Sequence, residues 1–135
     1  MDSLFFLIAE YANVSTGGKL NVMGIFNTLF AARFPARHPS LHIVAKLSSG
    51  AAEANVSKRL KIKLLNDDGT EIWATPELPL KVPASVNGRR VENNVIVALT
   101  DLVFPTDGDY QFSLLVDDDE KDVAPLYVVN RPATG

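Results

Sequence analysis

Residues 108–129, GDYQFSLLVDDDEKDVAPLYVV, are the part of the chain that decides its fold class. Apolar residues recur at every second position from Tyr110 to Val116, an acidic turn at 117–120 follows, and apolar residues resume at 123–129. This spacing places one face of each strand in a core, and an acidic turn between two such runs is typical of a β-hairpin. The stretch therefore predicts a hairpin at the end of an all-β domain.

The same alternation runs through most of the chain. It is clearest at 58–65, where Leu60, Ile62 and Leu64 are expected to point inward, and Asn66-Asp67-Asp68-Gly69 then predicts a hairpin turn. A glycine inside an expected strand, Gly24, indicates a bulge or a close approach of backbone. Further strands are expected at 4–12, 19–30, 41–47, 71–75 and 91–104, with a short or edge strand among the prolines of 76–83.

These patterns predict an antiparallel β-sandwich of roughly seven to eight strands, either immunoglobulin-like or jelly-roll-like. The 135-residue chain has the length of one domain and shows no repeat or linker. We expect a single domain at 1–130 and a frayed C-terminal tail at 131–135. The region 31–39 is expected to be an irregular connection, because it contains Pro35 and Pro39.

Composition excludes several classes of function. The chain has no cysteine, so disulfides, cysteine nucleophiles and thiolate zinc sites are ruled out. A net charge of -3 provides no general attraction to nucleic acid or to anionic membranes. The apolar run Leu4–Ala9 has no basic residue before it and is far shorter than the about 20 residues of a membrane span. It is therefore interpreted as a core strand of a cytoplasmic protein, and neither nucleic acid nor a membrane is expected as a partner.

The sequence shows no catalytic constellation. His38 and His42 are four residues apart, but Pro39 lies between them, so they lack the helical frame that would place both on one face. No serine lies in a Gly-x-Ser-x-Gly elbow. We therefore expect a protein that is not an enzyme and has no cofactor.

Acidic turns suggest one alternative function, binding of calcium or of a small ligand. Calcium prefers several oxygen ligands, and successive loops of a sandwich alternate between its two ends. The turns at 66–69 and 105–108 should then share an end, with 117–120 at the other. The candidate ligands are Asp67, Asp68, Asp107 and Asp109. The simpler interpretation is that aspartate is a common turn residue.

Opposite charges on two segments suggest an interaction surface. Arg59, Lys61 and Lys63 should share the outward face of one strand, and Asp117, Asp118 and Asp119 lie in the final turn. The basic face would suit an acidic protein partner, and opposite patches on one subunit can support head-to-tail self-association. A solvated strand face that discourages aggregation is the alternative.

Three segments carry more apolar residues than one core needs. Leu4–Ala9, Val95–Leu99 and Leu126–Val129 are apolar at successive positions, so both faces of those strands are apolar. A two-layer sandwich covers only one face of each sheet. Loops such as 31–39 and 48–57 should cover part of the surplus, or another chain should do so. We therefore expect protein–protein contacts, with a partner protein or with itself as a homo-oligomer.

Two motifs carry a resemblance to a known family. Ala9-Glu10-Tyr11-Ala12-Asn13, followed by the stretch KLNVMGIF at 19–26, resembles the opening of a family of small bacterial single-domain proteins of unknown function. The resemblance extends through GDYQF at 108–112, and so covers most of the chain. It implies a bacterial, cytoplasmic, single-domain protein and assigns no site.

Overall fold

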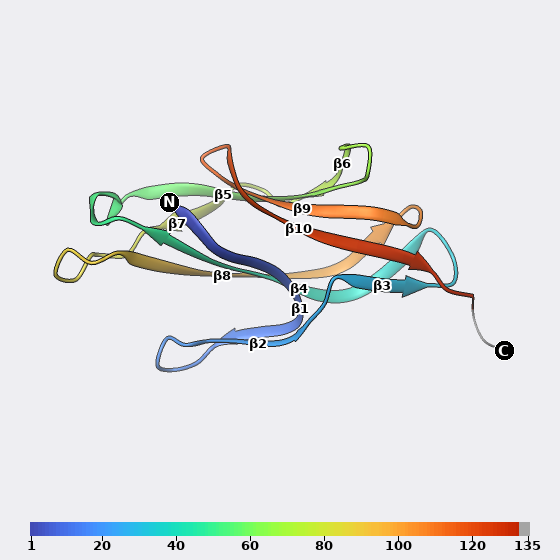
Figure 1. The fold of residues 1–135 in the computed structure, drawn as a ribbon, viewed down its shortest axis with the longest axis horizontal. Coiled ribbons are helices and arrows are strands. Elements are labelled where there is room, and N and C mark those ends of the chain that lie inside the picture. Colours follow the sequence, from blue (N-terminus) through green and yellow to red (C-terminus); the bar gives the residue numbers. More distant parts are fainter. Residues whose placement is uncertain (133–135) are drawn as a thin grey trace.

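The computed structural model describes residues 1–132 and consists almost entirely of β-strands (Figure 1). The strands are β1 (Asp2–Val14), β2 (Leu20–Ile25), β3 (Thr28–Ala31), β4 (Ala36–Ser49), β5 (Ser57–Leu65), β6 (Glu71–Ala74), β7 (Leu78–Lys81), β8 (Val91–Phe104), β9 (Gly108–Val116) and β10 (Asp119–Asn130). One 3-10 turn, η1 (Ala51–Glu53), precedes β5. The predicted all-β fold is confirmed, although the strands number ten, because the strand expected at 19–30 is divided and the short strand expected among the prolines forms as β7.

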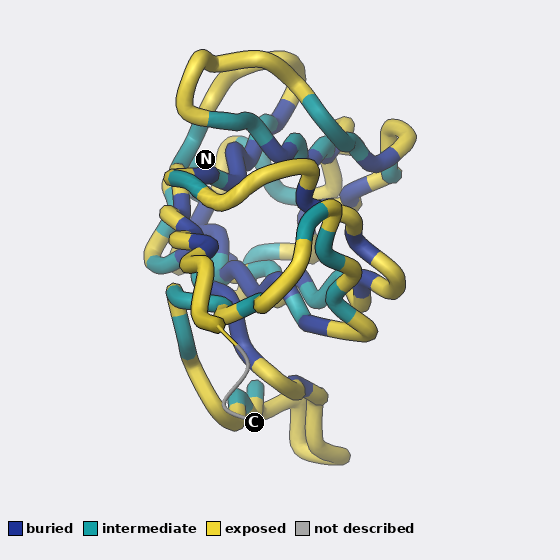
Figure 2. The backbone as a smooth tube through the Cα atoms, turned by 90° about the vertical axis from the view of Figure 1, so that its right-hand side faces the viewer, coloured by how far each residue is buried: buried dark blue, intermediate teal, exposed yellow. Residues whose placement is uncertain are grey.

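The strands form two sheets that pack face to face. A four-stranded sheet has the order β2-β1-β4-β8, and a six-stranded sheet has the order β3-β10-β9-β5-β6, with β7 also paired to β5. The core lies between the sheets, and Figure 2 shows that buried positions run through the middle of the molecule. Its largest fully buried side chains include Ile43, Ile62, Leu64, Phe104, Phe112 and Leu114.

The final hairpin forms as predicted. Val116 of β9 pairs with Asp119 of β10, which leaves Asp117 and Asp118 as a two-residue turn. Their φ angles are 50° and 66°, as in a type I′ turn, and aspartate tolerates this left-handed region better than most residues. Tyr110, Phe112, Leu114 and Val116 are all buried, which confirms the inward face.

The strand expected at 19–30 is divided between the two sheets. The Phe26 N–H donates to the Ile8 carbonyl in the four-stranded sheet, at 3.0 Å, and the Asn27 carbonyl accepts from the Tyr127 N–H in the other sheet, at 2.7 Å. The chain therefore changes sheets at 26–27 and continues as β3. Because β3 runs parallel to β10, the prediction of an antiparallel sandwich fails at this one pair.

The β1–β2 hairpin covers the outer face of the four-stranded sheet. Its inner side contributes Ala12, Leu20 and Val22 to a second apolar cluster with Ala9 and Val44, joined by Phe5, Leu7 and Ile96. Asn94 of β8 also donates to the Gly18 carbonyl at the hairpin tip, at 3.5 Å. The hairpin thus covers Phe5, Leu7 and Ala9, whereas loops 31–39 and 48–57 or another chain were expected to do so, and Leu4 stays exposed.

Gly24 in this hairpin shows the predicted close approach. Its φ is +69°, and a Cβ atom at this position would lie 3.0–3.1 Å from the side-chain carbons of Glu10. An L-residue is disfavoured at such a backbone angle and would also contact Glu10 too closely. Glycine at position 24 therefore allows β2 to lie tightly against β1.

The strand β4 begins earlier than the expected 41–47. It pairs with β8 in one continuous register from Ala36↔Phe104 to Ser49↔Val91, so Pro39 lies within a strand. In that register Pro39 is opposite Asp101, whose φ is +56°. Leu99 and Leu102 are both buried despite being three residues apart, because the backbone at Asp101 shifts the alternation by one position. Proline is tolerated at such irregular points of a sheet.

The C-terminal tail begins later than position 131. The Arg131 N–H donates to the Ala31 carbonyl at 2.9 Å, and its guanidinium lies 3.6 Å from the centre of the Phe30 ring. Arg131 is therefore held against β3. Residues 133–135 of the expected tail lie outside the described residues.

Candidate interaction sites

The acidic turn of the final hairpin binds Arg59 of the same subunit. The Arg59 backbone N–H donates to Asp117 Oδ1 at 2.9 Å, and its guanidinium donates to Asp118 Oδ2 at 3.2 Å and to Glu77 at 3.3 Å. The β5–β9 pairing brings these groups together, since Leu60 lies opposite Val116. The opposite charges considered for head-to-tail association are therefore already paired within one subunit.

The other predicted interaction residues also have charged partners, except Lys61. Lys63 pairs with Glu71 at 3.5 Å, and Asp119 pairs with Lys121 at 2.9 Å. Lys61 lies opposite Leu115 and forms no ion pair within residues 1–132. The outward orientation of Arg59, Lys61 and Lys63 is as predicted, but neighbouring acids offset most of the positive charge of this face.

Glu53 is the centre of a second charge cluster. Its carboxylate accepts from Lys58 Nζ at 2.7 Å and from the α-ammonium of Met1 at 2.9 Å. Hydrogen bonds from these two cations lower the pKa of Glu53 from 4.5 to about 2. The same Glu53 carboxylate raises the pKa of Lys58 above its ordinary value. These ion pairs hold η1 and the start of β5 against the N-terminus.

The four proposed calcium ligands gather at one end of the sandwich. Asp67, Asp68, Asp107 and Asp109 line a pocket of about 240 Å³, which confirms that the turns at 66–69 and 105–108 share an end. The turn at 117–118 lies instead beside Arg59, at the start of β5. Among the residues that the structure describes, no three His, Asp or Glu side chains are placed to hold a metal ion together.

A groove beside this pocket combines acidic and apolar walls. It encloses about 450 Å³ on the outer side of the six-stranded sheet, and Asp67 and Asp109 line it as well. Leu65, Pro125 and Tyr127 form its apolar part. These residues come from three neighbouring strands or their ends, because Gln111 of β9 pairs with both Leu65 and Pro125.

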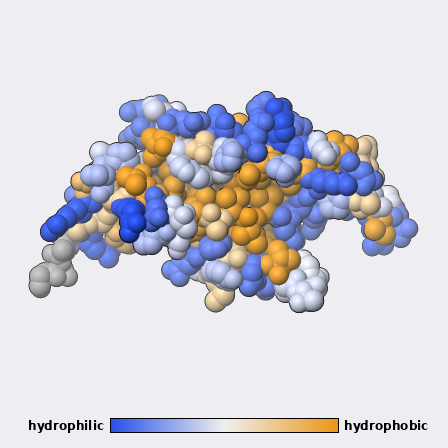
Figure 3. Space-filling model, turned by 180° about the vertical axis from the view of Figure 1, so that it is seen from behind, coloured by the Kyte–Doolittle hydropathy of each residue, from blue (hydrophilic) through white to orange (hydrophobic). Residues whose placement is uncertain are grey.

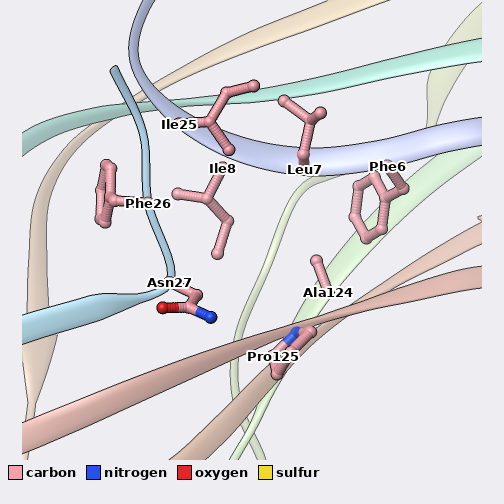
Figure 4. A pocket seen from close by; sticks show the side chains of 8 residues that line it. All are labelled: Phe6, Leu7, Ile8, Ile25, Phe26, Asn27, Ala124 and Pro125. Carbon is pink, nitrogen blue, oxygen red and sulfur yellow. The ribbon is translucent and has the colours of Figure 1, made fainter.

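An apolar slot lies on the opposite, inner side of β10. It has a volume of about 320 Å³ and lies between β1 and β10, as Figure 4 shows. Phe6, Ile8 and Ala124 line it, together with Leu7, Ile25, Phe26, Asn27 and Pro125. A hydrogen bond from the Ser3 hydroxyl to Asp122, at 2.7 Å, joins the two sheets on this side of the molecule.

The opposite side of the molecule has an open sheet edge. The strand β8 pairs with β4 only, so its second edge has no backbone partner within residues 1–132. On this side, four apolar side chains from both sheets pack against the core and are only partly buried: Ile72, Trp73, Leu78 and Val97. Figure 3 shows the corresponding apolar area in the middle of the molecule seen from behind.

The two histidines lie beside aromatic rings. The His42 ring packs edge-on against Tyr11, and its Nδ1 is 3.1 Å from the Glu10 carbonyl. The His38 ring is 6.3 Å from that of Phe26. Within the described part of the chain, neither histidine is hydrogen bonded to a carboxylate or a hydroxyl group.

Comparisons with known proteins place the chain in a family. A search of curated proteins finds no match. Among solved structures, the chain is similar to Pseudomonas fluorescens alkylpurine DNA glycosylase AlkC bound to DNA containing an abasic site analog, with 11% identity and a TM-score of 0.47. That match covers 91% of this chain but only 30% of the glycosylase chain. The model of a family of unknown function, DUF6941, matches residues 4–129, and the chain therefore belongs to this family.

Proposed function

We propose that the protein is a non-enzymatic module that assembles with a second copy of itself through the open edge of β8. The observation that carries this proposal is the length and composition of that edge. Val91–Phe104 is a 14-residue strand without lysine, arginine or proline, and its centre, Val95–Leu99, is entirely apolar. A long apolar edge strand is a template for pairing with another strand.

The other strands on the same side are protected against such pairing. β6 and β7 have four residues each, and β7 contains both Pro79 and Lys81. Short strands, proline and lysine are the usual means by which sheets avoid edge-to-edge contact. On the far side of the molecule, Pro125 lacks an N–H, and the Val123 N–H is occupied by the Asp122 carboxylate. The β8 edge has none of these features.

Antiparallel pairing of β8 with β8 of a second copy would provide hydrogen-bond partners for the backbone groups along this edge. A two-fold axis near Ala98 would join the two four-stranded sheets into one continuous sheet, with the same residues contributed by each subunit. Contact would also extend to the partly buried apolar side chains of Val97, Leu78 and Trp73. A stable interface of this kind should bury more than about 1,000 Å² in total.

The remaining parts of the proposal rest on sequence. The resemblance of the opening motif supports a bacterial, cytoplasmic protein. No helix among residues 1–132 is long and apolar enough to cross a membrane. The aromatic packing of His38 and His42 supports a structural role for both, in keeping with a module that has no catalytic activity.

Light scattering over a wide range of protein concentration tests the proposal. The wild-type protein should approach twice its mass of 14.7 kDa. Ala98→Lys combined with Thr100→Lys should remain at 14.7 kDa, because both positions are exposed and like charges would face each other across the two-fold axis.

The matched control places two lysines at alternate exposed positions of β2, as Asn21→Lys with Met23→Lys. This control should dimerise like the wild type, since β2 and β8 are the opposite edge strands of the four-stranded sheet. A wild-type protein that stays monomeric at millimolar concentration would refute the proposal. A dimer that persists in the β8 variant would refute the assignment of the interface.

A further inference from the structure

The outer face of β10 presents an uncovered row of apolar side chains. Along this strand Ala124, Leu126 and Val128 are buried, whereas the alternate residues Val123, Tyr127 and Val129 are 39%, 38% and 41% exposed. Phe30 of β3 pairs with Val129 and is 51% exposed, so the row continues onto the neighbouring strand and ends where the Arg131 guanidinium lies over the Phe30 ring. The prediction that Leu126–Val129 is apolar on both faces is therefore confirmed, and one of these faces is in solvent.

The acidic groove lies beside the middle of this row. Pro125 and Tyr127, between Val123 and Val129, line the groove together with Asp67 and Asp109. Tyr127 is paired with Asp109, and Asp68 and Asp107 line the neighbouring pocket, so four carboxylates lie on this side of the row. Across residues 1–132, none of these four forms an ion pair with a lysine, arginine or histidine.

These four aspartates differ from most other acidic residues of the surface, which have basic partners. Asp117 and Asp118 are paired with Arg59, Glu53 with Lys58, and Asp101 with Arg37. Uncompensated carboxylates beside apolar walls are complementary to a side chain that has a long apolar stem and a cationic head. Arginine fits best, because its guanidinium can bind carboxylates bidentately and can stack on an aromatic ring.

We propose that this groove binds an arginine from an extended, basic segment of a partner protein. The arginine stem would lie against Leu65, Pro125 and Tyr127, and its guanidinium would reach Asp67 and Asp109. Alternate apolar residues of the same segment would cover Val123 and Val129 along β10. This surface lies on the six-stranded sheet and is independent of the β8 edge, so it binds the segment whether or not the protein dimerises.

A fluorescent hexapeptide of alternating arginine and valine is the probe, and fluorescence anisotropy is the readout. Asp67→Asn combined with Asp109→Asn should weaken binding by about tenfold, because it removes two exposed charge pairs with the guanidinium. Asp101→Asn with Asp118→Asn is the matched control, because it removes the same charge from distant sites. This control should bind the peptide as the wild type does.

A second variant tests the apolar wall. Tyr127→Ser should weaken binding while leaving its dependence on salt unchanged, because it removes stem packing and no charge. An exposed strand position should tolerate this substitution, and unfolding by urea verifies that the variant is folded.

Three results would overturn the proposal. The first is no binding at millimolar peptide, or equal weakening in the two aspartate variants. The second is a calcium-induced rise in melting temperature that Asp67→Asn with Asp109→Asn abolishes, which would assign the carboxylates to a metal ion. The third is a dimer that the same variant dissociates, which would assign this face to a second copy of the chain.

Discussion

Three glycines of the β1–β2 hairpin provide a graded test of how β2 is held against β1. Gly17 has ordinary backbone angles and open space around it, whereas Gly18 has a φ of +78° and equally open space. Gly24 combines a φ of +69° with Glu10 carbons 3.0–3.1 Å from the position of a new Cβ. Alanine at these three positions therefore separates the cost of backbone angle from the cost of contact.

The expected changes in unfolding free energy follow from these differences. Gly17→Ala should be neutral or stabilising by up to about 1 kcal/mol, because alanine restricts the unfolded chain. Gly18→Ala should destabilise by about 1–2 kcal/mol, the cost of an L-residue in the left-handed region. Gly24→Ala should destabilise by about 2–3 kcal/mol, since displacement of Glu10 adds about 1 kcal/mol.

Urea unfolding of the three variants provides the measurement. A double-mutant cycle with Glu10→Gly isolates the contact, because that substitution removes all three carbons near the new Cβ. The coupling energy between positions 10 and 24 should be about 1 kcal/mol. If Gly24→Ala is no more destabilising than Gly17→Ala, the close packing of β2 on β1 is wrong.

Two further substitutions test single interactions. Glu53 has its pKa lowered to about 2 in the folded protein, so its contribution to stability is present above about pH 4.5 and is lost as pH falls from there towards 2. Glu53→Gln should therefore reduce the acid-induced loss of melting temperature, by the equivalent of about 1 kcal/mol after allowance for solvent screening, and an unchanged acid profile would contradict this. Tyr110→Phe should destabilise by about 1–2 kcal/mol, because the buried Tyr110 hydroxyl donates to the Thr106 carbonyl at 2.6 Å. Tyr127→Phe, at an exposed ring, is the control and should leave stability unchanged.

The local sequence pattern was sufficient to predict the buried face of a strand wherever that strand packs against the main core on one side only. Leu60, Ile62 and Leu64 alternate without interruption, and all three are buried as predicted. The turn at 66–69 forms because the Asn66 side chain accepts from the N–H groups of Asp68 and Thr70, as asparagine commonly does in turns. Both features depend on residues close in sequence, which is why the sequence alone predicts them.

Features that depend on residues far apart in the sequence were not predicted. The change of sheet at 26–27 depends on the backbone of Ile8 and Tyr127, and the alternation around it contains no sign of a break. The inclusion of Pro39 in β4 depends on Asp101, which lies opposite it but is 62 residues later in the sequence. Likewise, the cover over part of Leu4–Ala9 comes from a hairpin whose own pattern predicts an ordinary strand pair.

The candidate sites were partly predictable. The rule that successive loops alternate between the two ends of a sandwich correctly predicted that Asp67 and Asp109 lie at the same end. The groove between these acids and Tyr127 was not foreseen, because it depends on how far β10 is offset along β9. The consecutive apolar residues at 126–129 were the available signal, since their outward members had to lie somewhere on the surface.

The change of sheet at 26–27 has a consequence for how the molecule unfolds. Phe26 hydrogen bonds to the four-stranded sheet, and the next residue, Asn27, hydrogen bonds to the six-stranded sheet. The two sheets therefore cannot separate without breaking one of these hydrogen bonds. The parallel pairing of β3 with β10 then ties the same segment to the last strand of the chain. The two layers should therefore lose their structure together, as one cooperative unit, with no state in which one sheet remains intact.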